Sequence, residues 1–415
     1  MKRILSLDGG GIRGVFTLQI LAKIEELLRQ EHKDGKLILD RPKQSHGDLV
    51  LSDVFDLIAG TSTGAIIAAF LSWGKSVAEV DELYRNHGSE IFAPSTIIPW
   101  LKDQFRGGQL PGTLLNHLAD LVQRFRAKFD SNAIESFFKT RFTEKDGKPA
   151  LLGTERLKTF LLIVMRNGST GGLWPVTNNP EAKYNRRHLP DGTPNPECNL
   201  DFPLWQLLRA STAAPTFFPP EEILLAGKPN LFMDGGVTPY NNPALIAVLT
   251  ATLPPYCMGW KAKREELHMI SVGTGLVRAR MPAKSAADIN LLDHIRHIAP
   301  ALIGAIAWEQ DAVCRVLGDC VHGEILDREI GALELPILLS GQEQKFTYAR
   351  YDHPLDEKHP RIKELPEGEI ALDDLRMIPL LQELGKEYAE EHVRVEHFYP
   401  RGIDFKPCPC SITRT

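Results

Sequence analysis

A serine lies in a glycine-rich stretch between two apolar runs of the sequence. Ser62 is the centre of GTSTG, which follows residues 54–59, a run typical of a buried strand, and precedes a helix-like run. The stretch matches G-x-S-x-G, a motif that holds a nucleophilic serine on a tight strand-to-helix turn. Gly60 and Gly64 omit side chains that would collide with neighbouring strands, and the positive end of the helix favours an oxyanion. A serine that only caps the helix is the alternative.

An aspartate occupies a comparable place later in the chain. Asp234 ends the short apolar run LFM and is followed by Gly235 and Gly236. Parallel α/β sheets bind their ligands at the carboxyl ends of the strands, where this aspartate is expected. A nucleophilic serine needs a base, usually a histidine, but none of the 13 histidines lies in a comparably distinctive loop. Asp234 is therefore a candidate site residue, with a common Asp-Gly turn as the alternative.

A third glycine-rich stretch follows the first apolar run. In ILSLDGGGIRG, Gly9, Gly11 and Gly14 have the spacing G-x-G-x-x-G before a helix-like run. Glycines let backbone N–H groups point inward together at the positive end of a helix, where they bind a phosphate or the oxyanion of acyl transfer. Arg13 adds a positive charge beside them. A nucleophile nearby favours the oxyanion, and Ser62 supplies one.

Short apolar runs alternate with helix-like stretches through the first two thirds of the chain. This alternation predicts an α/β fold, a three-layer α/β/α architecture whose mainly parallel sheet is covered on both faces. The strands are expected at residues 3–7, 54–59, 160–165, 231–233 and 268–272.

The last third of the chain has a mainly helical pattern. Apolar residues keep helical spacing over 291–302, and Pro300 is expected to divide this run into two helices. The segment 345–355 predicts a strand. We therefore expect a catalytic domain at residues 1–276 and a mainly helical C-terminal extension at 277–415, packed on that domain and regulatory.

Residues 91–112 are a candidate lid over the site. They combine apolar residues such as Ile97 with prolines and glycines that discourage one long helix. Trp100 beside Lys102 suits a membrane interface, where an aromatic ring lies at head-group depth. Packing into the core is the alternative.

Composition restricts the class of protein. The 415 residues include 48 Lys and Arg against 53 Asp and Glu, a net charge of -5, so a nucleic acid polymer is not expected as a partner. The N-terminal apolar run stops at Asp8, too early for a signal peptide, and no apolar window would span a membrane. Six cysteines without CxxC spacing indicate free thiols and a cytoplasmic protein. Cys408 and Cys410 lack further ligands, so neither a metal nor a cofactor is expected.

Together, DGGGIRG, GTSTG and DGG resemble the patatin-like phospholipase family. The stretches STAAPTFFPP and ISVGTG are similar to that family too, and the resemblance covers roughly residues 3–276. It implies a lipid acyl hydrolase of phospholipase A type that cleaves fatty acyl esters of membrane phospholipids through an acyl-enzyme. Ser62 would be its nucleophile and Asp234 its general base, a dyad without histidine. The oxyanion loop would consist of Gly9, Gly10, Gly11 and Arg13.

The resemblance also sets expectations about partners. Some bacterial members carry a C-terminal region of this kind, among them antiviral effectors that degrade membrane lipids after binding a cyclic nucleotide. A small-molecule activator such as a cyclic nucleotide is expected on this basis. Peripheral contact with the inner membrane is expected because the substrate must be taken from a membrane surface, and a homo-oligomer is a further expectation.

Two alternatives come from other classes of protein. A nucleotide-binding, Rossmann-like protein would use the first glycine loop together with Asp40, which follows the strand-like LILD. It leaves GTSTG and DGG without a role. A catalytically inactive storage or scaffold protein would not need Ser62 and Asp234.

Overall fold

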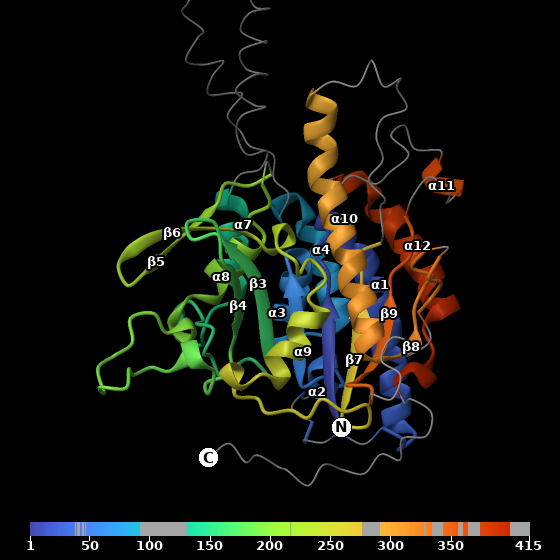
Figure 1. Cartoon of the computed structure of the whole chain (residues 1–415), viewed down its shortest axis with the longest axis horizontal. Helices are drawn as coiled ribbons and strands as arrows, with labels where there is room; N and C mark the ends of the chain where they lie inside the picture. The colour runs from blue at the N-terminus through green and yellow to red at the C-terminus, as the bar shows by residue number, and fades with distance from the viewer. Residues whose placement is uncertain are drawn as a thin grey trace, which may run out of the picture.

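Nine strands of the described residues form one sheet (Figure 1). The computed structural model describes residues 1–91, 131–275, 291–333, 343–355, 360–363 and 374–398, except residues 38, 40, 41, 44, 46, 216 and 328. The sheet order is β5-β6-β3-β2-β1-β7-β9-β8, and β4 pairs with β3 off this path. The strands are β1 (Lys2–Leu7), β2 (Leu57–Thr61), β3 (Phe160–Asn167), β4 (Leu173–Thr177), β5 (Glu221–Leu225), β6 (Lys228–Asp234), β7 (Leu267–Val272), β8 (Asp319–His322) and β9 (Thr347–Tyr351).

The centre of the sheet is parallel and one side of it is antiparallel. β1 pairs in parallel with β2 and β7, β2 pairs in parallel with β3, and β9 does so with β7 and β8. β3 pairs antiparallel with β4 and β6, and β5 pairs antiparallel with β6. The carboxyl ends of β1, β2 and β7 therefore lie at the same edge, followed by DGGGIRG, GTSTG and Gly273-Thr274-Gly275. The DGG stretch instead follows antiparallel β6, where Asp234 lies opposite Met165 of β3.

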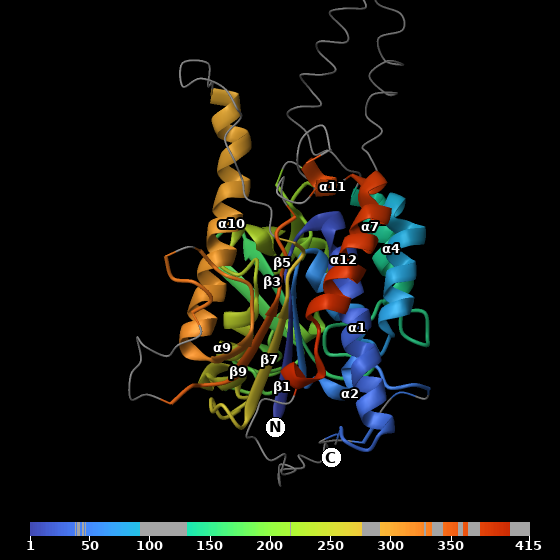
Figure 2. The same cartoon turned by 90° about the vertical axis from the view of Figure 1, so that its right-hand side faces the viewer.

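Helices cover both faces of the sheet because side chains alternate along the buried strands. Leu5 and Ile58 belong to one apolar core, and their neighbours Ile4 and Leu57 belong to the other. Figure 2 shows α1, α4 and α12 on one side of the sheet and α9 and α10 on the other. The helices are α1 (Gly14–Lys33), α2 (Leu51–Val54), α3 (Thr63–Ser72), α4 (Val77–Ile91), α7 (Ser131–Arg141), α8 (Leu204–Ser211), α9 (Ala244–Thr252), α10 (Leu291–Leu317), α11 (Pro360–Lys363) and α12 (Ile378–His392).

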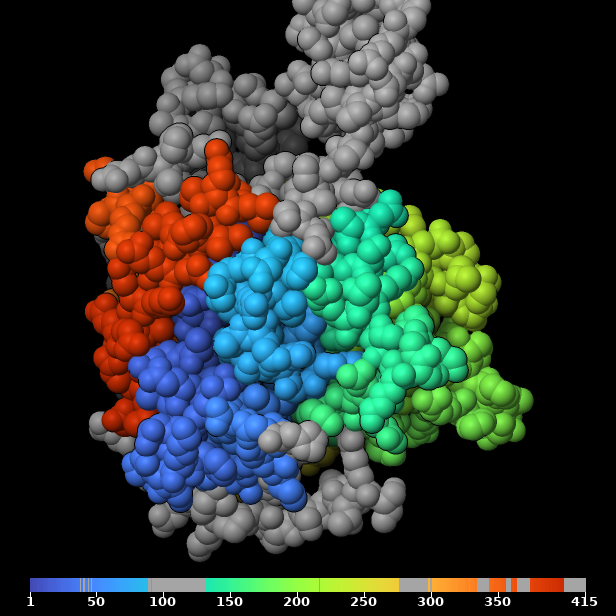
Figure 3. Space-filling view, turned by 180° about the vertical axis from the view of Figure 1, so that it is seen from behind, coloured from blue at the N-terminus to red at the C-terminus, as the bar shows by residue number. Residues whose placement is uncertain are grey.

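The two ends of the described chain pack together. α12 lies against α1, where Phe16 and Tyr388 meet with ring centroids 5.8 Å apart. Figure 3 shows the red C-terminal segment beside the blue N-terminal one on this face. β8 and β9 also continue the central sheet, so segments beyond residue 276 complete the same architecture. The boundary at residue 276 stays a prediction.

The α/β class and the helices on both faces are confirmed, while two local predictions are wrong. The strand expected at 54–59 begins only at Leu57, because Val54 ends α2 and the Asp56 carboxylate accepts a hydrogen bond from the Arg3 N–H. α10 continues through residue 300 without the expected division. A proline removes only one helical hydrogen bond, and this long helix continues without it. Ile298 and Leu302, on either side of residue 300, are 54% and 57% exposed, so packing at this point does not explain the continuity.

Candidate active site

Ser62 lies on the turn between β2 and α3 with a left-handed backbone. Its φ of 54° lies in a region that residues other than glycine rarely adopt. A Cβ added to Gly60 would lie 2.2 Å from the carbonyl oxygen of Gly64, and one added to Gly64 would lie 2.2 Å from that of Leu7. The two glycines thus allow the close approach of β1, β2 and α3 that this strained turn requires.

Asp234 is the last residue of β6 and accepts a hydrogen bond from Ser62. The Ser62 Oγ donates to Asp234 Oδ2 over 2.6 Å, and the N–H of Gly236 donates to Asp234 Oδ1, also over 2.6 Å. The aspartate is only 4% exposed. Burial raises the pKa of Asp234 to about 6, against the two hydrogen bonds and the charge of Arg209, which lower it. A carboxylate in this state is more basic than usual and accepts a proton more readily.

Ser211, which the sequence did not single out as a site residue, supports the turn. Its Oγ accepts a hydrogen bond from the Ser62 N–H over 3.1 Å and donates to the carbonyl oxygen of Val164 over 2.6 Å. Gly235 packs on the same carbonyl, because a Cβ there would lie 2.4 Å from that oxygen. Ser211 therefore links the Ser62 turn to β3, and Asp234 is held to the same strand by its own pairing with Met165. Ser211 is the first residue of STAAPTFFPP, a stretch already noted as similar to the family. Its bond to the Ser62 N–H, however, depends on packing that the sequence does not show.

The first glycine loop lies beside the serine. A Cβ added to Gly9 would be 3.2 Å from the Cβ of Ser62. The Gly9 N–H donates to the carbonyl oxygen of Asn241 over 3.1 Å. Gly11 has a φ of 58°, which favours glycine, and a Cβ on Gly10 would lie 2.1 Å from Thr274 Oγ1. The loop is thus held against the serine by contacts that larger residues would break.

Arg13 and Gly14 complete the loop where α1 begins. The Arg13 Nη1 donates to the carbonyl oxygen of Gly275 over 3.0 Å, which ties the loop to the end of β7. A Cβ on Gly14 would lie 2.6 Å from Thr63 Oγ1, so α1 approaches the start of α3 closely. The structure therefore brings all the candidate site residues to one edge of the sheet. Their catalytic roles stay predictions.

Residues 5–248 match the sequence model of a family described as patatin-like phospholipase, which covers more than half of the chain. The chain belongs to this patatin-like phospholipase family. The matched residues include DGGGIRG, GTSTG and DGG, of which the dinucleotide-binding alternative uses only the first.

Several named proteins are similar to this chain. A cGAMP-activated phospholipase of Vibrio cholerae serotype O1 is 28% identical over 277 residues, covering 66% of this chain and 64% of that protein. The human calcium-independent phospholipase A2-gamma is 30% identical over 247 residues, covering 59% of this chain and 25% of that protein. Patatin-17 of Solanum cardiophyllum is 25% identical over 292 residues, covering 66% of this chain and 61% of that protein. The chain spans less than two thirds of the length of each.

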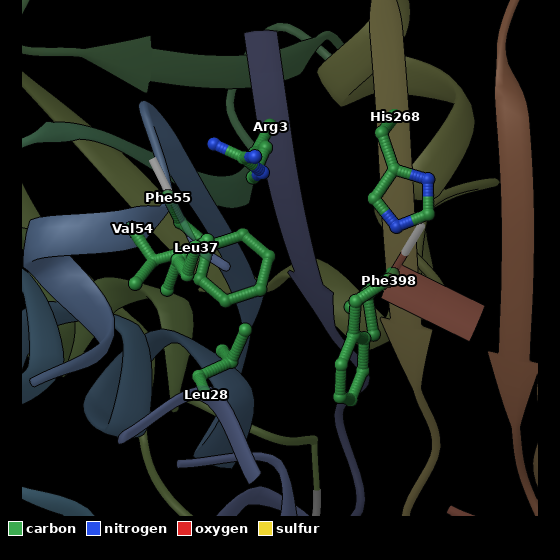
Figure 4. A pocket seen from close by; sticks show the side chains of 8 residues that line it. Arg3, Leu28, Leu37, Val54, Phe55, His268 and Phe398 are labelled. Atoms are coloured by element: carbon green, nitrogen blue, oxygen red, sulfur yellow. The ribbon is translucent and has the colours of Figure 1, made fainter. Parts of the chain in front are cut away.

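The candidate site of this patatin-like protein is separate from the pocket drawn in Figure 4. That pocket lies at the amino ends of β1 and β7, with His268 and Phe398 on one side and Leu28 and Phe55 on the other. Ser62 follows the carboxyl end of β2, at the opposite edge of the sheet. His268 is 1% exposed, and burial lowers its pKa to about 3, so it is a neutral core residue far from the serine.

Several predictions concern residues outside those described. These are Asp40, the lid segment 92–112, Cys408 and Cys410; of the lid, only Ile91 is described, and it is buried at the end of α4. Within the described residues, no helix is long and apolar enough to cross a bilayer. No group of three or more His, Cys, Asp or Glu residues there could hold a metal ion.

Proposed function

We propose that this patatin-like protein is a lipid acyl hydrolase of phospholipase A type that cleaves fatty acyl esters of membrane phospholipids. The observation that carries the proposal is the 2.6 Å hydrogen bond from Ser62 Oγ to a buried aspartate. Because burial raises the pKa of Asp234 to about 6, the carboxylate is ionised at neutral pH and still basic enough to take the serine proton.

The reaction has two halves. In the first, Ser62 Oγ forms a bond to the ester carbonyl carbon while its proton passes to Asp234 Oδ2. The ester C–O bond then breaks, and the leaving lysophospholipid alcohol takes that proton. In the second half, water attacks the acyl carbon and gives a proton to Asp234. The bond from that carbon to Ser62 Oγ then breaks, Asp234 returns the proton to Ser62 Oγ, and the fatty acid leaves.

The glycine loop would stabilise the oxyanion in both halves. We assign the backbone N–H groups of Gly10 and Gly11 to this role, because that of Gly9 is already bonded to Asn241. Arg13 contributes positive charge at the same end of α1.

A fluorophosphonate probe tests the chemistry and separates an active serine hydrolase from a scaffold or a nucleotide-binding protein. We expect it to label the wild-type protein and not the Ser62→Ala variant. Ser72→Ala is a matched control, since Ser72 is a fully buried serine of α3 whose Oγ has no hydrogen-bond partner among the described residues. Labelling of Ser62→Ala at the wild-type rate contradicts the assignment.

The similarity to the Vibrio cholerae protein named cGAMP-activated phospholipase supports a cyclic-nucleotide activator for this chain as well. Hydrolysis of phospholipid vesicles should then rise when cGAMP is added, and the Ser62→Ala variant should stay inactive. An unchanged rate at saturating cGAMP contradicts activation by this nucleotide and leaves the dyad unaffected.

A further inference from the structure

Arg350 lies on β9, beyond the residues that match the family, and its guanidinium is buried against the catalytic loop. The residue is 3% exposed. Its Nη1 donates to Asp8 Oδ1 over 2.9 Å and its Nη2 donates to Asp8 Oδ2 over 2.6 Å, so the pair is bidentate. Asp8 directly precedes Gly9. Arg350 therefore fixes the residue from which the glycine loop begins.

A second path leads from the same guanidinium to the other side of the loop. Nη2 also donates to Asp352 Oδ2 over 2.7 Å, and Asp352 Oδ1 accepts from the Gly275 N–H over 3.0 Å. The Gly275 carbonyl oxygen in turn accepts from Arg13 Nη1 over 3.0 Å. Thr274 Oγ1 donates to the carbonyl oxygen of Gly9 over 3.2 Å. Hydrogen bonds thus link Arg350 to both ends of the loop, directly to Asp8 and through Asp352 and Gly275 to Arg13.

We propose that Arg350 is a positioning residue for ester hydrolysis, a role that rests on the proposed function of the Ser62 site. It holds the loop of Gly9, Gly10 and Gly11 in the geometry that receives the oxyanion. Its positive charge also offsets the carboxylates of Asp8 and Asp352, which would otherwise repel that oxyanion through a poorly solvated interior.

Arg350 stays protonated, and therefore positively charged, in the folded protein. Burial alone would lower the pKa of Arg350, but Asp8 and Asp352 outweigh burial and raise it. Removal of the guanidinium leaves the carboxylates of Asp8 and Asp352 without their shared cationic partner, and Asp352 keeps only the uncharged donor N–H of Gly275. The loss is therefore electrostatic as well as mechanical.

The decisive variants are Arg350→Met and the double variant Arg350→Met with Asp8→Asn. Arg315→Met is the matched control. Arg315 is also a buried arginine of the C-terminal segment, bidentate to Asp311 over 3.0 and 2.7 Å, but it lies on α10 and bonds to no residue of the loop. Both arginine losses should lower the melting temperature, so stability alone does not separate them.

Activity does separate them. The substrate is p-nitrophenyl butyrate, and active sites are counted by titration with the fluorophosphonate probe. We expect kcat per active site to fall on the order of tenfold or more in Arg350→Met, while KM stays within about twofold. Arg315→Met should keep the kcat of the wild type. Neutralising Asp8 in the Arg350→Met protein should restore part of kcat, because one of the two unpaired carboxylates is gone. A purely structural role predicts no such recovery.

Two further measurements keep the test decisive. If Arg350→Met does not fold, Arg350→Lys retains the charge but loses the bidentate geometry, and its kcat should fall less than tenfold with KM unchanged. Hydrogen exchange of the amides of residues 9–11 does not need activity: it should accelerate in either Arg350 variant and not in Arg315→Met. Unchanged exchange there, or a wild-type kcat in a folded Arg350 variant, overturns the role of Arg350. A wild-type protein that is inactive both with and without cGAMP overturns the proposed function instead, and the exchange experiment still decides the positioning role.

Discussion

The hydroxyl of Ser62 donates to Oδ2 of Asp234 over 2.6 Å, although 172 positions separate the two residues along the chain. Their strands, β2 and β6, lie on either side of β3 in the sheet. The other carboxylate oxygen of Asp234 accepts from the Gly236 N–H. This bond orients the carboxylate toward the serine, so under the proposed mechanism two residues would do the work of a histidine triad.

Removal of either dyad residue should abolish ester hydrolysis without loss of the fold. We expect kcat to fall on the order of a thousandfold or more in Ser62→Ala and in Asp234→Asn. Because the two residues act as one unit, the double variant should be no slower than the slower single variant. Steady-state kinetics with a soluble ester measures this. If Asp234→Asn keeps near wild-type turnover, a different base must be sought.

The activity should depend on pH through the carboxylate. Only the ionised form of Asp234 accepts the serine proton, and burial raises its pKa to about 6. We therefore expect kcat/KM for a soluble ester to fall about tenfold per pH unit below pH 6 and to reach a plateau above it. A plateau that extends down to pH 4 is incompatible with a base of raised pKa.

The raised pKa of Asp234 also predicts that its carboxylate destabilises the folded protein at neutral pH. The pKa of Asp234 rises from 3.8 to about 6, so the folded state binds the proton more tightly than the unfolded state. The resulting stability is present below pH 3.8 and is lost as the pH rises through 6. Asp234→Asn should raise the free energy of unfolding at pH 8 by up to about 3 kcal/mol. Urea unfolding of both proteins at pH 8 and pH 4 measures this gain, which should be much smaller at pH 4. A gain confined to pH 4 has the wrong sign.

The glycine loop should serve the transition state more than substrate binding. A Cβ at Gly10 would lie 2.1 Å from Thr274 Oγ1, so Gly10→Ala must displace the loop. We expect kcat to fall on the order of a hundredfold with little change in KM. Gly47→Ala is the control, since nothing lies within 4 Å of its added Cβ. If Gly10→Ala raises KM and leaves kcat intact, the loop binds substrate rather than the oxyanion.

The parts of the site that the sequence could predict are the parts encoded locally. Ser62 and Gly64 belong to one turn whose motif specifies both the strained backbone and the close approach of α3. Asp234 could be singled out because its Asp-Gly-Gly stretch follows a strand. In each case a few adjacent residues determine the local conformation. Parallel pairing brings the ends of β1 and β2 together, whereas Asp234 reaches that edge because antiparallel β6 pairs with the end of β3, where Asp234 lies opposite Met165.

The supporting contacts could not be predicted because they depend on long-range packing. Asp8 and Arg350 are 342 positions apart, and no local pattern pairs them. Ser211 lies in a stretch that resembles the family, but its bond to the Ser62 N–H exists only once α8 packs on β3. Pro300 shows the opposite error, since the local rule predicted a break in the helix that α10 does not have.

Release of fatty acid from phospholipid vesicles is the most direct measurement of the proposed activity. Wild-type protein and the control Ser72→Ala should release fatty acid and lysophospholipid in equal amounts, with cGAMP added if activation is required. Ser62→Ala and Asp234→Asn should release neither. Fatty acid release that persists in Ser62→Ala, or a wild-type protein that takes up the fluorophosphonate probe but leaves phospholipids intact, would contradict a phospholipase built on the Ser62–Asp234 dyad.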